Sequence, residues 1–333
     1  MSGSPVAHVL STAVSRYLAQ SVNTLKIHDY PARARVLLAR PLRRLAYKWR
    51  RPARARPRAQ GDLVVKIFVM LKNEDDLTLK WLKYHGSLVG YENLVVLDNG
   101  SDSPATTAAL AWARERGVVV HSEFWTLVDF VKKGRIIERL IKQNDAKNPA
   151  DFYLPLDCDE FVSVVTNDGV DCSRDALRAE LIRHLDSPDP LLIHAGLDNN
   201  PHKPGWFRWS PGQRKIFFAA NTCEFLDHGY HCGMSRLGTD PTRTRIVYIH
   251  YHFKPFDTLV EHSRAKLLPF TQDFSAANME KYSKDPNRPG THCAVHLVRT
   301  REEYQRLFDG PEYAEFPAVA DKFRAVGETL PFS

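Results

Sequence analysis

The chain has 333 residues, of which 43% are hydrophobic, so it can bury one large core or two smaller ones. It has no apolar run approaching about 18 residues, and its start lacks a charged segment followed by a compact apolar one. The sequence therefore predicts neither a membrane-spanning helix nor a secretory signal. The five cysteines are odd in number and form no C-x-x-C pair. This argues against a disulfide framework or a structural zinc site and favours a cytoplasmic protein.

The net charge of +7 is unevenly distributed along the chain. Residues 1–60 contain 13 Lys and Arg and one acid, Asp29, whereas the remainder contains 33 basic and 38 acidic residues. The apolar residues between Val6 and Leu25 fit one face of a short amphipathic helix. Residues 33–58 are dense in arginine, alanine and proline, and residues 54–58 resemble an extended linker. We therefore expect either a basic tail that contacts the anionic inner face of the membrane, or a solvated, disordered tail.

From Gly61 onward the pattern becomes that of a folded domain. Four short apolar runs are typical of strands: residues 63–71, 94–97, 118–121 and 152–156. The segments between them have the spacing of helices: residues 77–88, 105–116 and 127–142. This alternation predicts an α/β fold with a mostly parallel sheet flanked by helices and joined by right-handed crossovers.

Polar residues follow three of the predicted strands where each strand ends. They are Asn73 and Glu74, Asp98 and Asp102, and Asp157 and Asp159. Parallel sheets of this kind bind their ligands beyond the carboxyl ends of the strands, so we expect the three groups to converge on one ligand site.

The third group carries the clearest chemical signal. Asp157 and Asp159 are two residues apart, so their side chains share one face of an extended backbone. Carboxylates placed this way suit a hard divalent cation that also binds substrate phosphates, although an isolated D-x-D is often a solvated acidic turn. The chain has no G-x-G-x-x-G after its first strand and no P-loop motif, so neither of these nucleotide-binding folds is supported.

Four motifs in this order resemble those of nucleotide-sugar glycosyltransferases with the GT-A fold. The resemblance is to the family 2-like group, particularly its branch related to family 92, and it runs from about residue 66 to about residue 268. The motifs are residues 69–74 (VMLKNE), the helix with Trp81 and His85, residues 96–102 (VLDNGSD) and residues 156–161 (LDCDEF).

The resemblance implies a nucleotide-sugar-binding half over residues 61–165 and an α+β acceptor-binding half with a C-terminal extension over residues 166–333. It implies that acids after the first two strands, Glu74 and Asp98, contact the base and ribose of a UDP- or GDP-sugar, with Asn73 and Asp102 beside them. The D-x-D would hold Mn²⁺ or Mg²⁺ against the diphosphate. Positive charge at the start of the third helix, from Lys132, Lys133 and above all Arg135, would add to the grip on the phosphates.

The second half of the chain is rich in histidine. His250 and His252 share one face of a predicted strand, as two metal ligands would. The resemblance implies a histidine here that either completes the cation's shell or touches the diphosphate. We take His252 as the third metal ligand. The base that deprotonates the acceptor is best sought in Glu224 and Asp227, with Glu160 or Asp198 as further possibilities.

The sequence thus predicts a metal-dependent hexosyltransferase-like enzyme of polysaccharide biosynthesis that moves a sugar to a glycan or a lipid-linked acceptor. Two alternatives stay open. The same carboxylates and histidines suit a metal-dependent hydrolase or phosphodiesterase, although no H-x-D or H-E-x-x-H motif is present. The basic tail suits a nucleic-acid-binding protein, but the acidic body and the lack of a recognised binding module argue against nucleic acid as a partner.

Overall fold

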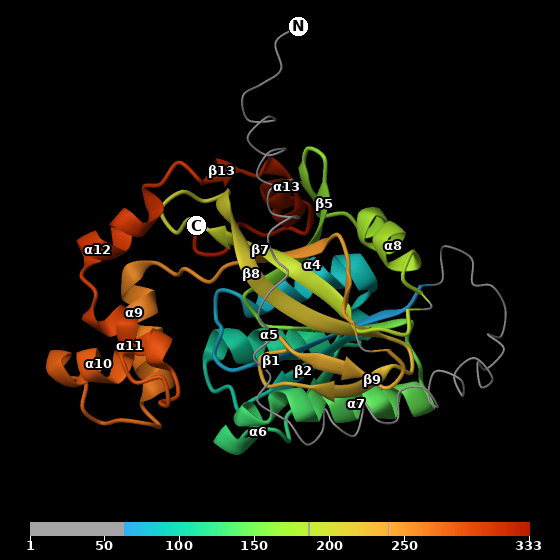
Figure 1. Cartoon of the computed structure of the whole chain (residues 1–333), viewed down its shortest axis with the longest axis horizontal. Coiled ribbons are helices and arrows are strands. Elements are labelled where there is room, and N and C mark those ends of the chain that lie inside the picture. The colour runs from blue at the N-terminus through green and yellow to red at the C-terminus, as the bar shows by residue number, and fades with distance from the viewer. Residues whose placement is uncertain (1–62, 186, 239) are drawn as a thin grey trace, which may run out of the picture.

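The computed structural model describes residues 63–185, 187–238 and 240–333 (Figure 1). The predicted tail, amphipathic helix and linker of residues 1–60 lie outside these ranges. Within them the chain forms one large mixed sheet with helices on both faces. The predicted α/β fold with a helix-flanked sheet is therefore confirmed.

The first four strands lie side by side in the order β3-β2-β1-β4 and are all parallel. Their bounds are β1 Val65–Leu71, β2 Leu94–Asp98, β3 Val119–His121 and β4 Phe152–Leu156. Every residue of β1 and β4 is buried, as expected for strands that are covered on both faces. The four predicted strands are thus confirmed.

Alternate residues of β1 pack against different helices, as the two-residue period of a strand requires. Ile67 and Val69 belong to the core that contains helix α4 (Thr78–Val89) and helix α5 (Pro104–Arg114). Phe68 and Met70 belong to a second core, on the other face, that contains helix α7 (Lys133–Lys147). The parallel half of the sheet is thereby held rigidly between two helical layers.

The predicted helix over residues 127–142 is wrong in one respect, because the structure has two helices there. Helix α6 (Leu127–Val131) begins with a capping box between Thr126 and Asp129, and α7 (Lys133–Lys147) begins after a break at Lys132, which has φ −102° and ψ 13°. The backbone of α7 passes so close to Asp227 that a Cβ on Gly134 would lie 2.0 Å from the Asp227 carbonyl oxygen. The uniform apolar spacing of the sequence does not reveal this break.

The sheet continues beyond β4 through strands that come later in the chain. The order after β4 is β8-β7-β12-β5-β6, with β8 antiparallel to β4 and to β7, and β12 parallel to β7. The bounds are β5 Glu160–Thr166, β6 Gly169–Asp171, β7 Leu191–Asn199, β8 Trp206–Ala219 and β12 Ile246–His250. Two short strands pair with the inner strands of this sheet: β11 (Thr242–Arg243) with β7 and β13 (Ala314–Glu315) with β8. A separate hairpin is formed by β9 (Cys223–Leu226) and β10 (Gly233–Ser235). Strands from both predicted halves share one sheet, and the boundary at residue 165 stays a prediction.

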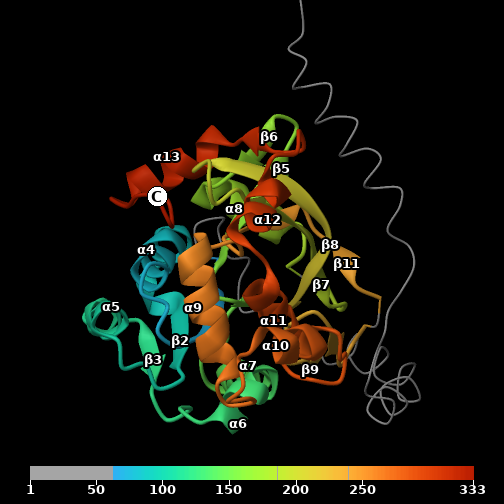
Figure 2. The ribbon, with the colours of Figure 1, turned by 90° about the vertical axis from the view of Figure 1, so that its left-hand side faces the viewer.

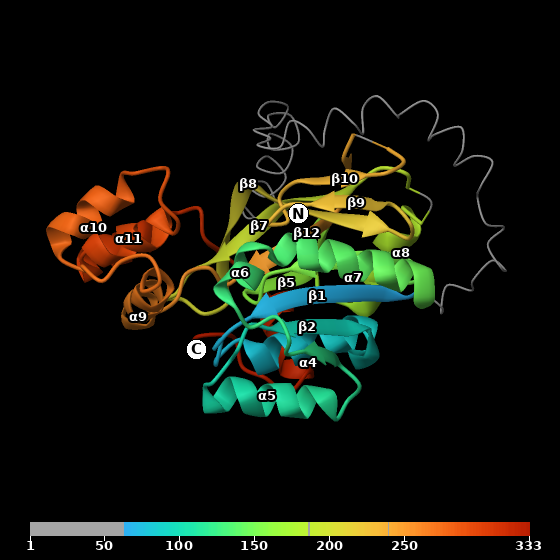
Figure 3. The ribbon, with the colours of Figure 1, turned by 90° about the horizontal axis from the view of Figure 1, so that it is seen from below.

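A small helical unit lies at the end of the molecule toward which β1 points (Figure 3). It consists of α9 (Phe256–Leu267), α10 (Ala276–Ser283) and α11 (Thr291–Val298), and it has its own core around Leu267, Met279 and Tyr282. Figure 2 views the molecule from this end, with α9 and α11 in front of the sheet. The helical unit therefore stands beside the edge where the strand-end residues lie.

The remaining helices complete the fold around the sheet. They are α8 (Arg174–Ile182), α12 (Arg301–Gln305), α13 (Pro317–Ala325) and the 3-10 turns η2 (Tyr91–Asn93) and η3 (Arg306–Phe308). Near the end of the chain, Phe323 of α13 contacts Tyr84 of α4 and Phe161 of β5 through ring contacts, so the C-terminal segment is part of the main core. Across the described ranges, each helix is too short or too polar to span a bilayer.

Candidate functional site

The turn after β4 carries the D-x-D, and its first carboxylate is held by two lysines. Lys133, at the start of α7, donates to Asp157 Oδ1 at 2.5 Å, and Lys215 of β8 donates to Asp157 Oδ2. Burial alone would raise the pKa of Asp157, but the two ammonium groups outweigh it and hold that pKa well below its usual range. Asp157 is therefore ionised, with both of its oxygens engaged.

Lys215 also links this turn to the next strand. Its ammonium group lies 3.0 Å from Glu160 Oε1 and 3.1 Å from the carbonyl oxygen of Gly229, and its side chain is only 1% exposed. The other oxygen of Glu160 accepts the backbone N–H of Asp157 at 2.9 Å. The buried Glu160, the partly exposed Asp157 and the two buried lysines thus balance each other around the turn, which satisfies the rule that buried charges need partners.

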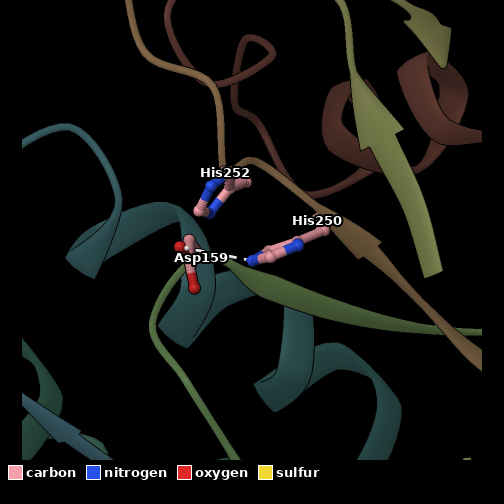
Figure 4. A group of neighbouring side chains, drawn as sticks. All are labelled: Asp159, His250 and His252. Atoms are coloured by element: carbon pink, nitrogen blue, oxygen red, sulfur yellow. Dashed lines mark ion pairs between the residues drawn. The ribbon is translucent and has the colours of Figure 1, made fainter. Parts of the chain in front are cut away.

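The second carboxylate of the D-x-D lies in a different group of side chains. Asp159 faces His250 and His252, and one potential ligand atom from each of the three lies within 4.8 Å of the other two (Figure 4). Asp159 Oδ2 is 3.5 Å from His250 Nε2, and the two imidazole rings are 4.9 Å apart between centroids. The structure therefore brings the predicted metal residues Asp159 and His252 together and adds His250.

His250 is oriented by partners on neighbouring strands. Its Nδ1 lies 3.1 Å from Gln213 Oε1 and 3.3 Å from Asp198 Oδ1, and Gln213 in turn donates to Asp198 at 2.8 Å. These contacts leave Nε2 directed at Asp159. A polar partner on the far nitrogen is the arrangement that fixes the ring of a metal-binding histidine.

The charges of the two histidines differ in the metal-free state. Burial lowers the pKa of His250, but Asp159 and Asp198 outweigh this effect and raise it to about 10. Burial and the neighbouring His250 lower the pKa of His252 to about 4. One carboxylate and two imidazoles form a donor set that fits a divalent transition ion, and binding such an ion requires His250 to lose its proton.

Glu74, the predicted nucleotide contact after β1, is bound by the segment that leads into the helical unit. Lys254 Nζ is 2.8 Å from Glu74 Oε2, and His262 of α9 is 3.3 Å from Oε1. The side chains of Glu74 and Lys254 are 15% and 10% exposed. Burial lowers the pKa of His262 to about 2, so its ring is neutral. The end of β1 is thus tied by charge to Lys254 and through the neutral His262 to α9, next to the D-x-D turn.

The other predicted nucleotide contacts form a connection between the ends of β1 and β2. Asn73 adopts a left-handed backbone, with φ 52°, and its side chain donates to Asp102 at 2.6 Å while it accepts the backbone N–H of Asp102 at 2.9 Å. Asp98 accepts the backbone N–H of Ser101 at 2.9 Å. Asn73 and Asp102 are therefore engaged with each other, and the role of all three in nucleotide binding stays a prediction.

The remaining predicted residues lie around α7 and the β9–β10 hairpin. Arg135 is paired with Glu138 at 2.9 Å and lies over the ring of Phe225, on the outer side of α7. The backbone carbonyl of Glu224 accepts a hydrogen bond from Lys142, and Asp227 Oδ1 accepts the N–H of Cys232 at 2.9 Å. Of these residues, Asp227 lies nearest to the D-x-D turn, because its backbone packs against Gly134 beside Lys133.

The interpretation of the sequence missed Lys215 and Gln213. It named Asp198 as a possible base but did not predict that Asp198 orients His250. One signal was present, because Lys215 directly precedes the apolar run Ile216, Phe217 and Phe218 of a strand, where a buried lysine is costly unless an acid lies nearby. Lys133, which was considered for the phosphates, contacts Asp157, whereas Arg135 points to the outer face.

Comparisons with known proteins give no sequence relative and only distant structural likenesses. No family model matches the chain, and no curated protein matches it. TarS of S. aureus matches with a TM-score of 0.34 and 12% identity, over 79% of this chain and 55% of the TarS chain. The chain thus spans about half the length of TarS.

Two further solved structures are similarly distant. The mannosyltransferase PcManGT from Pyrobaculum calidifontis, in complex with GDP-Man and Mn²⁺, has a TM-score of 0.34 and 13% identity, over 96% of this chain and 84% of that one. A cytidylyltransferase from Leptospira borgpetersenii has a TM-score of 0.29 and 11% identity, over 74% and 98%. Similarities at this level carry no argument about the reaction or substrate of this protein.

Proposed function

We propose that the protein is a metal-dependent glycosyltransferase that moves a sugar from a UDP- or GDP-sugar to a hydroxyl of a glycan or of a lipid-linked acceptor. The observation that carries the proposal is the turn at Asp157–Asp159. One of its carboxylates faces two histidines in a metal-type cluster, and the other holds two lysines. This pairing of a cation site with ammonium groups suits a diphosphate.

The chemistry of sugar transfer requires such an arrangement. When the bond from the sugar to the diphosphate breaks, negative charge grows on the leaving phosphates, and preorganised positive groups stabilise that charge. Asp159, His250 and His252 would hold a divalent ion, and that ion would supply Lewis-acid neutralisation there. Lys133, at the start of α7, contacts Asp157 and supplies a second positive group, while Lys215 of β8 fixes the turn through the other oxygen of Asp157.

The cation is expected to be Mn²⁺ more than Mg²⁺. Mg²⁺ demands oxygen ligands in near-ideal octahedral geometry, whereas Mn²⁺ accepts imidazole nitrogen more readily. Asp157 is proposed to position the lysines, because both of its oxygens are already engaged, and its direct contact with the metal stays a prediction.

The residues proposed to bind the donor nucleotide and to deprotonate the acceptor are chosen by their positions and by the partners that they already have. Asp98 is the acid proposed to bind the ribose or base, because Glu74 is already occupied by Lys254 and His262. Asp227 is proposed as the base for the acceptor hydroxyl in preference to Glu224. Asp198 and Glu160 are nearly inaccessible and are engaged in ionic contacts, which makes them poor bases.

The test is turnover by the purified full chain with a panel of UDP- and GDP-sugars, in the presence of Mn²⁺. Release of UDP or GDP is expected for one donor and is expected to stop in a His252→Gln variant. A His121→Gln variant, altered at a half-exposed histidine that pairs with Glu123, is the matched control and should keep full activity. Phosphodiester cleavage without any sugar-nucleotide turnover would instead favour the hydrolase alternative.

A cytoplasmic location at the inner face of the membrane is proposed from the basic residues 1–60 alone. A segment of this charge is attracted to anionic lipid, at about 1 kcal/mol for each basic residue near the surface. Removing residues 1–60 should reduce sedimentation with anionic vesicles and leave turnover of a soluble acceptor unchanged. Loss of that turnover in a folded truncated protein would contradict this division of roles.

A further inference from the structure

Helix α6 and the residue before its cap present large apolar side chains to solvent. Trp125 is 65% exposed and Val128 is 57% exposed. Half of the exposed large hydrophobic residues in the described part of the chain lie in this short segment: Trp125, Leu127, Val128, Phe130 and Val131. Single exposed apolar residues need no explanation, but a contiguous group marks an interaction surface.

The surface next to this patch is basic. Helix α7 follows α6 directly, and both run across the face seen from below in Figure 3. A shallow groove along α7 is lined by Arg135, Arg139, Lys142 and Lys147, with Glu138 as the acid among its lining residues. Lys132, between the two helices, is also exposed. An apolar patch is thus continued by a stripe of positive charge.

This combination has the chemistry of a bilayer interface. Tryptophan, leucine and phenylalanine enter the boundary between headgroups and acyl chains, while lysine and arginine contact anionic headgroups. The 13 basic residues of residues 1–60 add charge of the same sign to the same molecule. Charge complementarity therefore selects an anionic membrane as the partner of this surface.

The patch also borders the candidate site. Phe130 packs against His228 with ring centroids 5.5 Å apart, and Lys133, at the start of α7, reaches Asp157 on the inner side. We infer that α6 and the basic face of α7 form a membrane-docking surface that inserts Trp125, Leu127 and Val128 into an anionic bilayer beside the site. The inference rests on the surface itself and does not depend on the reaction proposed above.

The test is cosedimentation of the full chain with vesicles of phosphatidylglycerol and phosphatidylcholine. A Leu127→Asp/Val128→Asp variant is expected to lower the partition coefficient at least about tenfold, because it removes insertion and adds charge that the lipid repels. The matched control is Val119→Asp/Leu307→Asp, which adds the same charge at two other exposed apolar residues and should stay within about twofold of wild type. Equal losses in both variants, or no loss in the α6 variant, would overturn the inference.

A second measurement covers the case in which the α6 variant does not fold. Brominated lipids should quench part of the tryptophan fluorescence of the wild-type protein, and a Trp125→Phe variant should lose that quenching. Unchanged quenching in Trp125→Phe would show that Trp125 stays outside the bilayer and would overturn the inference. So would a wild-type protein that is dimeric in solution and becomes monomeric in the α6 variant, since a second copy would then cover the patch.

Discussion

Lys215 donates a hydrogen bond from the middle of strand β8 to Asp157 at the end of strand β4. Its side chain is 1% exposed, so the ammonium group depends on Asp157 and Glu160 for its stability. Burial lowers the pKa of Lys215, but these two acids outweigh it and raise that pKa above the usual value. The D-x-D turn is thus held in place by a charge that comes from inside the sheet.

Replacing Lys215 with Met should therefore be strongly destabilising. The buried Glu160 and the partly exposed Asp157 would be left beside each other without Lys215. Removing one partner of a buried ion pair typically costs about 3–5 kcal/mol. Denaturant unfolding monitored by circular dichroism measures this loss.

Lys142→Met is the matched control for that experiment, because Lys142 pairs with Glu138 near the surface with 35% of its side chain exposed. Such a pair is worth about 0–1 kcal/mol. If Lys215→Met is no less stable than Lys142→Met, the ionic group of Lys133, Lys215, Asp157 and Glu160 does not stabilise the fold.

Substitution of each D-x-D aspartate by asparagine should change the stability of the protein by a different amount. Asp157→Asn weakens charged hydrogen bonds from two lysines and should cost about 1.5–3 kcal/mol of unfolding free energy. Asp159→Asn weakens one ionic contact, the 3.5 Å contact to His250, and should therefore cost less than Asp157→Asn. Thermal shift with added Mn²⁺ completes the comparison, because Mn²⁺ should stabilise Asp157→Asn and fail to stabilise Asp159→Asn. Equal responses of the two variants would contradict the separate roles.

The strands and their polar ends were predictable because the sequence encodes them locally. Each of the four parallel strands is a short apolar run, and the residues that follow it, such as Asp98 and Asp157, must lie at the carboxyl edge of the sheet. The pairing of His250 with His252 was visible for the same reason, since alternate residues of an extended segment share a face.

The ionic partners were not predictable because they come from distant segments. Lys215 is separated from Asp157 by 58 positions, and only the antiparallel pairing of β8 with β4 brings the two strands together. Glu74 is paired with Lys254, 180 positions away. The break between α6 and α7 lies at Lys132, and Gly134 just after it packs against the backbone of Asp227, a contact that the helical spacing of the sequence does not reveal.

His85 should make the protein sensitive to acid. It is fully buried, its Nδ1–H donates to the Trp81 carbonyl oxygen, and its Nε2 accepts the N–H of Val162. Burial lowers its pKa to about 3, below the unfolded value of about 6.5, so the unfolded chain binds the proton more readily. Stability from this residue is complete above pH ~6.5 and falls by about 1.4 kcal/mol per pH unit toward pH ~3.

Unfolding at pH 7 and pH 5 measures this effect. A His85→Leu variant loses two hydrogen bonds and is less stable at both pH values, but it should lose less additional stability on acidification than the wild type, by about 2 kcal/mol. If both proteins lose the same amount between pH 7 and pH 5, His85 does not stay neutral in the folded state.

Asp98 is the residue that should decide nucleotide affinity. Hydrogen bonds from a ribose or base to a carboxylate are worth about 1.5–3 kcal/mol, so Asp98→Ala should weaken donor binding by roughly 10- to 150-fold. Asp321→Ala, at an exposed acid of α13, serves as the control and should bind as wild type does. Competition of UDP and GDP against a fluorescent nucleotide analogue provides the affinities. An Asp98→Ala variant that binds as tightly as the control would remove Asp98 from the site.

Titration calorimetry of the full chain with UDP and GDP, with and without Mn²⁺, tests whether Asp159, His250 and His252 hold a cation through which a nucleotide binds. We expect that one of the two nucleotides binds, that binding requires Mn²⁺, and that it is lost in Asp159→Asn and His252→Gln but kept in the control His121→Gln. The Mn²⁺-dependent affinity should also rise with pH above 7, because His250 must lose its proton before it can bind the ion. Failure of both nucleotides to bind in the presence of Mn²⁺, or equal binding by wild type and Asp159→Asn, would contradict the account.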